Sequence, residues 1–302
     1  MSARLARLSR ARNWRAAGIL AAPILTAALC LGTAGAQSPA PSQFKSEFEK
    51  QEKIYRSKGA GVPSGYITTR SLARYEETLP SGFSDALRKL GPANRWLDIG
   101  AGGGNAILDY HSPEYDAAQA GKSARPRGKA QAVALSIEDR RTDEWRQRAA
   151  SIGGNRIRYL FGKRLREYSR EELGKFHLIT DVYGGFSYTE SLSLFVEKVL
   201  DLLEINGGFY TMVQSVHLQD GKDKPSTWYL TELIDASGRD VTVCSWLKSV
   251  ACVKVACESK SDWDTPTELI HVQKVCNAVR VPPLKALLYE AGNPPGRRFR
   301  LE

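Results

Sequence analysis

Apolar and polar stretches along the chain predict strands that alternate with helices. Between the apolar runs, apolar residues recur at helical spacing. Leu192, Phe195 and Val199 are an example. Such an alternation is typical of an α/β fold with a parallel sheet. The predicted strands are 95–99, 132–137, 157–161, 176–182 and 209–216, and the predicted helices are 105–110, 140–150 and 190–204. We therefore predict a doubly wound, mostly parallel sheet within residues 94–302.

The pattern changes on either side of this alternation. Residues 37–93 predict a polar leader, a charged helix at 46–58 and a helical cap over 66–90 that is broken at 79–82. The segments 241–247, 250–257 and 269–281 are β-rich with little helix between them, so we expect a C-terminal extension of antiparallel strands at one edge of the sheet. We expect Asn206-Gly207-Gly208 to end the preceding helix.

The first 36 residues resemble a secretory signal peptide. Five arginines precede an apolar segment, Ala34-Gly35-Ala36 follows it, and no Asp or Glu occurs before Glu47. A basic region, an apolar region and a small-residue cleavage site are the parts of an export signal. We predict cleavage after Ala36, no stable membrane anchor afterwards, and a periplasmic or secreted protein. An uncleaved anchor and an organelle presequence are the alternatives.

Once the predicted signal peptide is removed, the net charge of the chain gives little information about its partners. Loss of residues 1–36 removes five arginines and no acid, which lowers the formal net charge from +10 to +5. That value is too small to indicate nucleic acid as a partner. The basic clusters at 125–127, 163–166 and 297–300 are interpreted as solvated surface.

The four cysteines left after cleavage lie within the β-rich extension. They are Cys244, Cys252, Cys257 and Cys276. An even number in an exported chain predicts two disulfides, and the sequence does not choose among the three possible pairings. Unpaired buried thiols are the alternative. Zinc is disfavoured because no C-x-x-C pair occurs, and we predict no metal site.

The candidate binding site is the stretch that follows the first strand, WLDIGAGGGN (96–105). Glycines at positions 100, 102 and 104 permit a sharp turn and leave room for a ligand. A dinucleotide site would have glycine where Asn105 stands, and the preceding Asp98 would repel a pyrophosphate. An acid here suits a ligand that carries an ammonium group as well as a carboxylate.

With these features, the segment from Arg95 to Thr211 resembles a class I S-adenosylmethionine-dependent methyltransferase, a Rossmann-like fold. The matching stretches are LDIGAGGG (97–104), SIED (136–139), FHLITDVYG (176–184) and INGGFYT (205–211). The resemblance implies S-adenosylmethionine as the cofactor. Lys163, rather than an acid, follows the third strand, and residues 111–129 form an insertion.

The resemblance also implies roles for individual residues. Asp98 would hold the amino group of the methionine moiety, and Glu138 would accept hydrogen bonds from both ribose hydroxyls. Asp181 and Tyr183 would face the methyl-transfer centre, and they are the weak candidates for catalysis. The cofactor-binding residues implied are Asp98, Gly100, Ala101, Gly102, Gly104, Glu138 and Asp181.

Three functions compete at this stage. The first is an exported enzyme that transfers a methyl group to an unknown small molecule or protein. The second is a catalytically inactive relative that serves as a binding or interaction module. The third, a nicotinamide-dependent enzyme, is disfavoured by Asn105. Candidates for a lid or for substrate contacts are Tyr66, Arg70, Tyr75 and the break at 79–82, and packing of this helical region on the sheet edge is the alternative.

Overall fold

The computed structural model describes residues 69–112, 126–189, 191–214, 217–219, 225–227, 232–260, 267–285, 287–290 and 296–299. The predicted signal peptide, the leader, the helix at 46–58 and most of the insertion at 111–129 lie outside the described residues. The domain boundaries at 36 and 93 therefore remain predictions.

The helices and strands follow in the order of the chain. The helices are α2 (Leu72–Thr78), α3 (Phe83–Arg88), α4 (Asn105–His111), α6 (Asp143–Ile152), η1 (Gly154–Arg156), η2 (Leu165–Glu167), α7 (Arg170–Leu173), α8 (Gly185–Tyr188), α9 (Leu192–Leu202) and α10 (Val243–Lys248). The strands are β1 (Arg95–Ile99), β2 (Gln131–Leu135), β3 (Ile157–Leu160), β4 (Phe176–Asp181), β5 (Leu203–Gln214), β6 (His217–Gln219), β7 (Pro225–Thr227), β8 (Glu232–Ile234), β9 (Asp240–Thr242), β10 (Val253–Lys260), β11 (Thr267–Lys274), β12 (Leu287–Glu290) and β13 (Gly296–Phe299).

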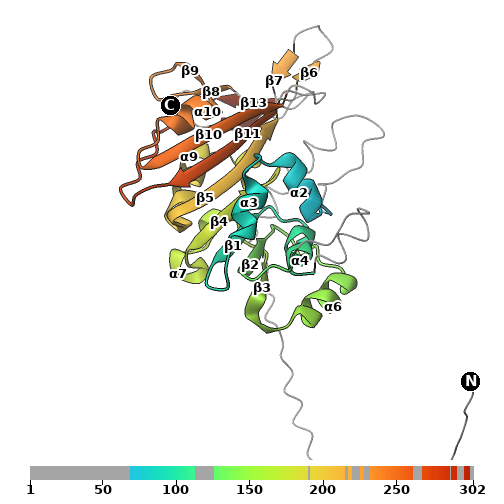
Figure 1. Cartoon of the computed structure of the whole chain (residues 1–302). Helices are drawn as coiled ribbons and strands as arrows, with labels where there is room; N and C mark the ends of the chain where they lie inside the picture. The colour runs from blue at the N-terminus through green and yellow to red at the C-terminus, as the bar shows by residue number, and fades with distance from the viewer. Residues whose placement is uncertain are drawn as a thin grey trace, which may run out of the picture. The chain divides into compact units, whose positions relative to one another are not determined.

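Within the described residues, seven strands form one sheet in the order β10-β11-β5-β4-β1-β2-β3 (Figure 1). Strands β1 to β5 pair in parallel, while β11 runs antiparallel to both β5 and β10. The chain builds outward from β1 to β3 and then continues from β4 on the other side of β1. In open α/β sheets, ligands bind beyond the carboxyl ends of the strands where the order reverses, which here is between β1 and β4. The predicted doubly wound sheet with antiparallel C-terminal strands is confirmed.

Both faces of the central strands β1, β2 and β4 are covered, which explains why these strands are apolar with little alternation. Leu97 and Ile99 belong to the core on one face, which includes α9 and α10. Trp96 belongs to the core on the opposite face, with α2, α3 and α4. The side chain of Asp98 has the same parity along β1 as that of Trp96, so it lies on the face covered by the helical cap.

The cap consists of α2 and α3, separated at the predicted break. Its first helix, α2, is capped by Ser71, whose hydroxyl accepts a hydrogen bond from the Arg74 amide. The Leu72 amide donates to the Asp109 carboxylate of α4 at 3.0 Å. The Glu258 carboxylate of β10 accepts hydrogen bonds from the Ser81 amide and hydroxyl. These contacts join the cap both to α4 and to the antiparallel edge of the sheet.

Two predicted elements were wrong. Residues 243–248 form helix α10 instead of a strand, because the Thr242 hydroxyl accepts from the Ser245 amide and caps a helix that buries Val243, Trp246 and Leu247. Asn206-Gly207-Gly208 does not end a helix, since β5 already begins at Leu203. The register of β5 against β4 shifts between Phe176 and Leu178, so the additional residues of β5 form an irregularity within the strand.

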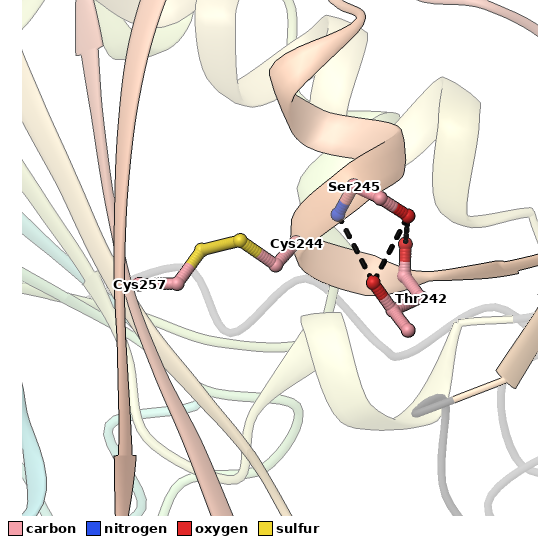
Figure 2. Close-up of a disulfide and its surroundings, with 4 residues drawn as sticks. All are labelled: Thr242, Cys244, Ser245 and Cys257. Carbon is pink, nitrogen blue, oxygen red and sulfur yellow. Dashed lines mark hydrogen bonds between the residues drawn. A yellow bond between two sulfur atoms is a disulfide. The ribbon is translucent and has the colours of Figure 1, made fainter.

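Two disulfides join the C-terminal extension, Cys244–Cys257 and Cys252–Cys276. The first connects α10 to β10, beside the hydrogen bonds between Thr242 and Ser245 (Figure 2). The second connects the residues that flank the β10–β11 pair, where the Val275 amide also donates to the Cys252 carbonyl. Among the described residues, no helix is long and apolar enough to cross a membrane.

Candidate functional site

The glycine turn after β1 touches the loop after β4. The amides of Gly100 and Ala101 both donate to the carbonyl of Leu135, and Gly100 has a φ of 71°. A Cβ atom on Gly100 would lie 2.4 Å from the Cα of Gly184. Only glycine therefore allows both this backbone conformation and this approach of the two loops.

The rest of the turn packs against a tyrosine from β3. Gly104, with a φ of 75°, precedes α4, and a Cβ there would lie 3.2 Å from the Tyr159 ring. The Tyr159 hydroxyl donates to the carbonyl of Gly102, and it lies 3.2 Å from the carbonyl of Glu138. Tyr159 thus connects the turn after β1 to the residues that follow β2.

Asp98 is fully buried at the end of β1, and three hydrogen bonds define its environment. The Tyr75 hydroxyl lies 2.9 Å from one carboxylate oxygen, and the Thr180 hydroxyl donates to the other at 2.8 Å. Trp96 Nε1 in turn donates to Thr180 at 2.9 Å. Burial raises the pKa of Asp98 to about 7, although the hydrogen bonds from Thr180 and Tyr75 oppose this shift. A carboxylate has about four acceptor positions, so this one can accept a further donor.

Asp181 is also fully buried, at the end of β4. Its carboxylate accepts hydrogen bonds from the amides of Gly184 and Phe186 at 2.9 and 3.0 Å. Burial raises its pKa to about 7, while these amides act in the opposite direction. The carboxylate therefore organises the loop after β4, which is the structural role of an acid in a turn.

Tyr183 lies in that loop with a φ of 53°, a conformation that is uncommon for a residue with a large side chain. Its ring is partly exposed, and the Arg70 guanidinium carbon lies 4.9 Å from the ring centre. Backbone of this kind persists where the surrounding structure holds it, here through the hydrogen bonds to Asp181. Of the two weak catalytic candidates, Tyr183 is the one whose side chain reaches the surface.

Glu138 follows the end of β2 with a partly exposed carboxylate that lies 2.5 Å from Arg140 Nη2. The neighbouring Asp139 is held by Arg141 through two hydrogen bonds of 2.8 and 2.7 Å, which hold the pKa of Asp139 at about 2. Of the two acids, Glu138 has the more exposed side chain, at 36% against 18% for Asp139. It is therefore the more accessible to a ligand.

The structure thus brings the predicted residues together at the ends of three adjacent strands. Asp98 and the turn of Gly100, Ala101, Gly102 and Gly104 follow β1, Asp181 and Tyr183 follow β4, and Glu138 follows β2. Tyr75 and Thr180 as partners of Asp98 were not predicted. Neither was the cluster in which Arg141 lies over the rings of Trp145, Tyr159 and Phe161. In the described part of the chain, no group of His, Cys, Asp and Glu could hold a metal ion.

Comparison with known proteins gives structural likenesses alone, since no family model and no curated protein matches the chain. The N-terminal domain of EvdMO1 with SAH bound is 10% identical, with coverage of 77% of this chain and 97% of that one and a TM-score of 0.42. Precorrin-6y C5,15-methyltransferase from Geobacter metallireducens is 14% identical, with coverage of 63% and 84% and a TM-score of 0.35. The glycopeptide N-methyltransferase MtfA complexed with SAM is 13% identical, with coverage of 64% and 92% and a TM-score of 0.37.

The strand order defines the class of fold. A parallel sheet that reverses between β1 and β4, followed by an antiparallel β11 inserted between β5 and β10, is the Rossmann-like arrangement of class I methyltransferases.

Proposed function

We propose that this protein binds S-adenosylmethionine at the ends of β1, β2 and β4 and transfers its methyl group to an acceptor. The observation that carries the proposal is the turn at Gly100, which passes against Gly184 directly beside the buried Asp98. A turn without side chains next to an acid suits a ligand with a cationic amino group. The strand order, which is that of class I methyltransferases, supports the choice of ligand.

Each predicted residue has a task in this proposal. Asp98 accepts a hydrogen bond from the ligand's ammonium, in addition to those from Tyr75 and Thr180. Glu138 exchanges its exposed ion pair with Arg140 for hydrogen bonds from two ribose hydroxyls. The turn at Gly100 and Ala101 supplies the surface against which the ligand lies.

The bound sulfonium supplies the electrophilic methyl group for an in-line displacement. The protein then has to align the acceptor and exclude water. An acceptor that arrives protonated must also lose a proton. Asp181 is enclosed by backbone amides, so we assign it to the support of the loop, and Tyr183 is placed to contact the acceptor.

We also propose that the protein acts in the periplasm or outside the cell. The two disulfides are typical of an oxidising compartment, in agreement with the export signal predicted for residues 1–36. Methyl transfer there would need a supply of a donor made inside the cell.

This need for a donor favours a second candidate, a binding module without catalysis. Its specific support is that Asp98 is fully buried and already accepts hydrogen bonds from two hydroxyl groups of the protein itself. In this alternative, Tyr75 and Thr180 complete a polar core and the sheet serves as a scaffold.

Isothermal titration of the purified protein with S-adenosylmethionine, SAH and NAD separates these functions. The proposed function requires binding of the first two and no binding of NAD. Release of SAH in the presence of a trial acceptor then reports methyl transfer. Absence of binding by all three ligands would leave the module as the better description.

Glu138→Ala provides the residue-level test. We expect it to weaken binding of SAH by about 1.5–3 kcal/mol, the usual contribution of hydrogen bonds to a charged group. Its stability should change little, because the pair with Arg140 is exposed. Asp143→Ala is the matched control, since its carboxylate is 93% exposed and lies beyond β2 on α6. An unchanged affinity of Glu138→Ala would remove Glu138 from the site.

A further inference from the structure

Strand β10 forms one border of the seven-stranded sheet, with β11 beside it (Figure 1). Its eight residues pair with β11 one to one, without a bulge or a proline. Edge strands are usually short or interrupted, because their free N–H and C=O groups can pair with another chain. In the part of the chain that the structure describes, no strand pairs with the outer side of β10.

The pairing with β11 determines which backbone groups of β10 face outward. The Val275 amide donates to the carbonyl of Cys252, the residue opposite it. Since hydrogen-bonded and non-hydrogen-bonded pairs alternate along an antiparallel ladder, the even-numbered residues of β10 direct their backbone groups to β11. The odd-numbered residues direct theirs away from the sheet, and they are Val253, Val255, Cys257 and Ser259.

The side chains of β10 carry opposite charges at self-complementary positions. Lys254, Ala256 and Glu258 have the same parity, so their side chains lie on one face of the sheet, and all three residues are exposed. The Glu258 carboxylate accepts a hydrogen bond from Ser81, so this is the face that the cap covers. The lysine precedes Ala256 by two residues, and the acid follows it by two.

A second copy of the chain fits this pattern. When two β10 strands pair antiparallel about a two-fold axis at Ala256, each Lys254 lies opposite Glu258 of the other copy. The same register places Val255 opposite Cys257, and both residues direct their backbone groups outward, as the hydrogen-bonded pairs require. The charged residues then form non-hydrogen-bonded pairs, in which the side chains approach most closely.

The charges also discriminate among registers and among partners. An axis at Val255 would place Lys254 opposite Ala256, and an axis at Cys257 would place it opposite Lys260. Neither arrangement pairs the lysine with an acid. A lysine on an edge strand discourages pairing with an arbitrary strand, which would have no acid at the matching position. The pattern therefore favours another copy of β10 as the occupant.

We propose that two copies of this protein associate through β10, so that their two seven-stranded sheets become one, with Lys254 of each copy paired to Glu258 of the other. An interface between two strands is small, so we expect a reversible dimer with a dissociation constant of about 10–100 µM. The inference is independent of the ligand proposed above, because it concerns the opposite edge of the sheet from β2 and β3 and no ligand-binding residue.

Sedimentation equilibrium of the purified protein, between about 1 and 500 µM, measures the association. The wild-type protein should change from monomer to dimer as its concentration rises. Lys254→Glu would place like charges opposite each other at two symmetric positions, so it should raise the dissociation constant about tenfold. Glu258→Lys should have the same effect, although it also removes the hydrogen bonds to Ser81.

Mixing the two variants separates lost pairing from damage to the fold. In a heterodimer of Lys254→Glu with Glu258→Lys, the two introduced charges attract each other, and the second position keeps its original pair. The affinity of the mixture should therefore return to near the wild-type value, which a misfolded variant could not achieve. Lys129→Glu is the matched control, since this exposed lysine precedes β2 on the other side of the sheet, and it should leave dimerisation unchanged.

Val255→Pro tests the backbone pairing. It removes an outward N–H but no hydrogen bond to β11, so it should weaken dimerisation at least about tenfold and leave the circular dichroism spectrum unchanged. A protein that remains monomeric at about 500 µM would overturn the inference. So would a dimer that tolerates both Lys254→Glu and Val255→Pro, because it would use another surface. Failure of the mixed charge variants to recover affinity would overturn the proposed register.

Discussion

Two regions of the sheet are held together in different ways. At the ends of β1 and β4, two loops meet at glycine residues and are held by buried carboxylates. At the β10–β11 edge, two disulfides join neighbouring elements. The first region has positive φ values at Gly100 and Tyr183 and two acids whose pKa values are raised by burial. Such features reduce stability and are typical of functional sites. The second region has a positive φ at Cys252 and one acid, Glu268, whose pKa is raised by burial, and it adds two covalent links. The comparison indicates that covalent links stabilise the antiparallel edge, whereas the end of the sheet proposed to bind a ligand is held by hydrogen bonds and close backbone contact.

The largest effect is expected from Gly100→Ala, which tests the contact between the two loops. The new Cβ would meet Gly184 at 2.4 Å in a backbone conformation with φ of 71°. Strain and overpacking together should lower the free energy of unfolding by about 4 kcal/mol, measured by urea denaturation.

Gly153→Ala is the control for that variant. Gly153 has a φ of 69°, but a Cβ atom on this residue would have no atom within 4 Å, so the variant should show the backbone strain alone, about 1–3 kcal/mol. Equal losses in the two variants would mean that the approach to Gly184 contributes nothing.

The second prediction concerns the stabilised region. Replacing Cys244 and Cys257 with serine opens a link between residues 13 apart in the sequence, which should lower the free energy of unfolding by about 3 kcal/mol. Affinity for SAH should stay at the wild-type value, because the disulfide joins α10 to β10 and neither carries a predicted ligand-binding residue.

Urea denaturation of the variant and of the wild-type protein, both under oxidising conditions, measures the contribution of this disulfide. A variant as stable as the oxidised wild-type protein would contradict the division between a stabilising edge and a binding end.

The third prediction concerns the slope of stability against pH. Asp98 and Asp181 have folded-state pKa values of about 7, above the ordinary value of 3.8. The folded protein therefore binds more protons than the unfolded chain between about pH 4 and 7. The contribution of these two groups to stability is greatest below about pH 4. It falls as the pH rises to about 7, by up to about 1.4 kcal/mol per pH unit for each group, and is constant at higher pH.

Asp98→Asn should remove roughly half of this decrease and make the protein more stable at about pH 8 than the wild type, while it weakens binding of SAH. Thermal denaturation between about pH 5 and 8 measures the slope. His111, whose pKa burial lowers to about 4, contributes in the opposite direction in both proteins and cancels in the comparison. Asp143→Asn, at an exposed position, should leave the slope unchanged, and an identical slope in Asp98→Asn would show that Asp98 does not change its charge on folding in this range.

The sequence was most informative where the local pattern and the tertiary environment agree. Strand β1 was predicted at the residues where it occurs, because a strand that is buried on both faces is apolar throughout. The turn at Gly100 was likewise predictable, since alternating glycines directly after an apolar strand are typical of a tight turn.

The misses have a common cause, which is contact between distant residues. Tyr75 is 23 residues from Asp98, and no local signal connects them. The pairing of Cys244 with Cys257 depends on α10, which was predicted as a strand because β-branched residues and cysteine weigh against a helix. A signal for this helix was present in the sequence. Thr242 is a good helix cap, and the apolar residues that follow it, Val243, Trp246 and Leu247, are at helical spacing.

The contact between the cap and β10 has a consequence for how the chain is made. Ser81 bonds with Glu258 across 177 residues, and the Lys260 ammonium donates to the Glu77 carbonyl across 183. Contacts of such high sequence separation form late and slowly during folding. The cap helices leave the ribosome early and must wait for β10, and a chain shortened before Glu258 would present the cap with one of its two anchors missing.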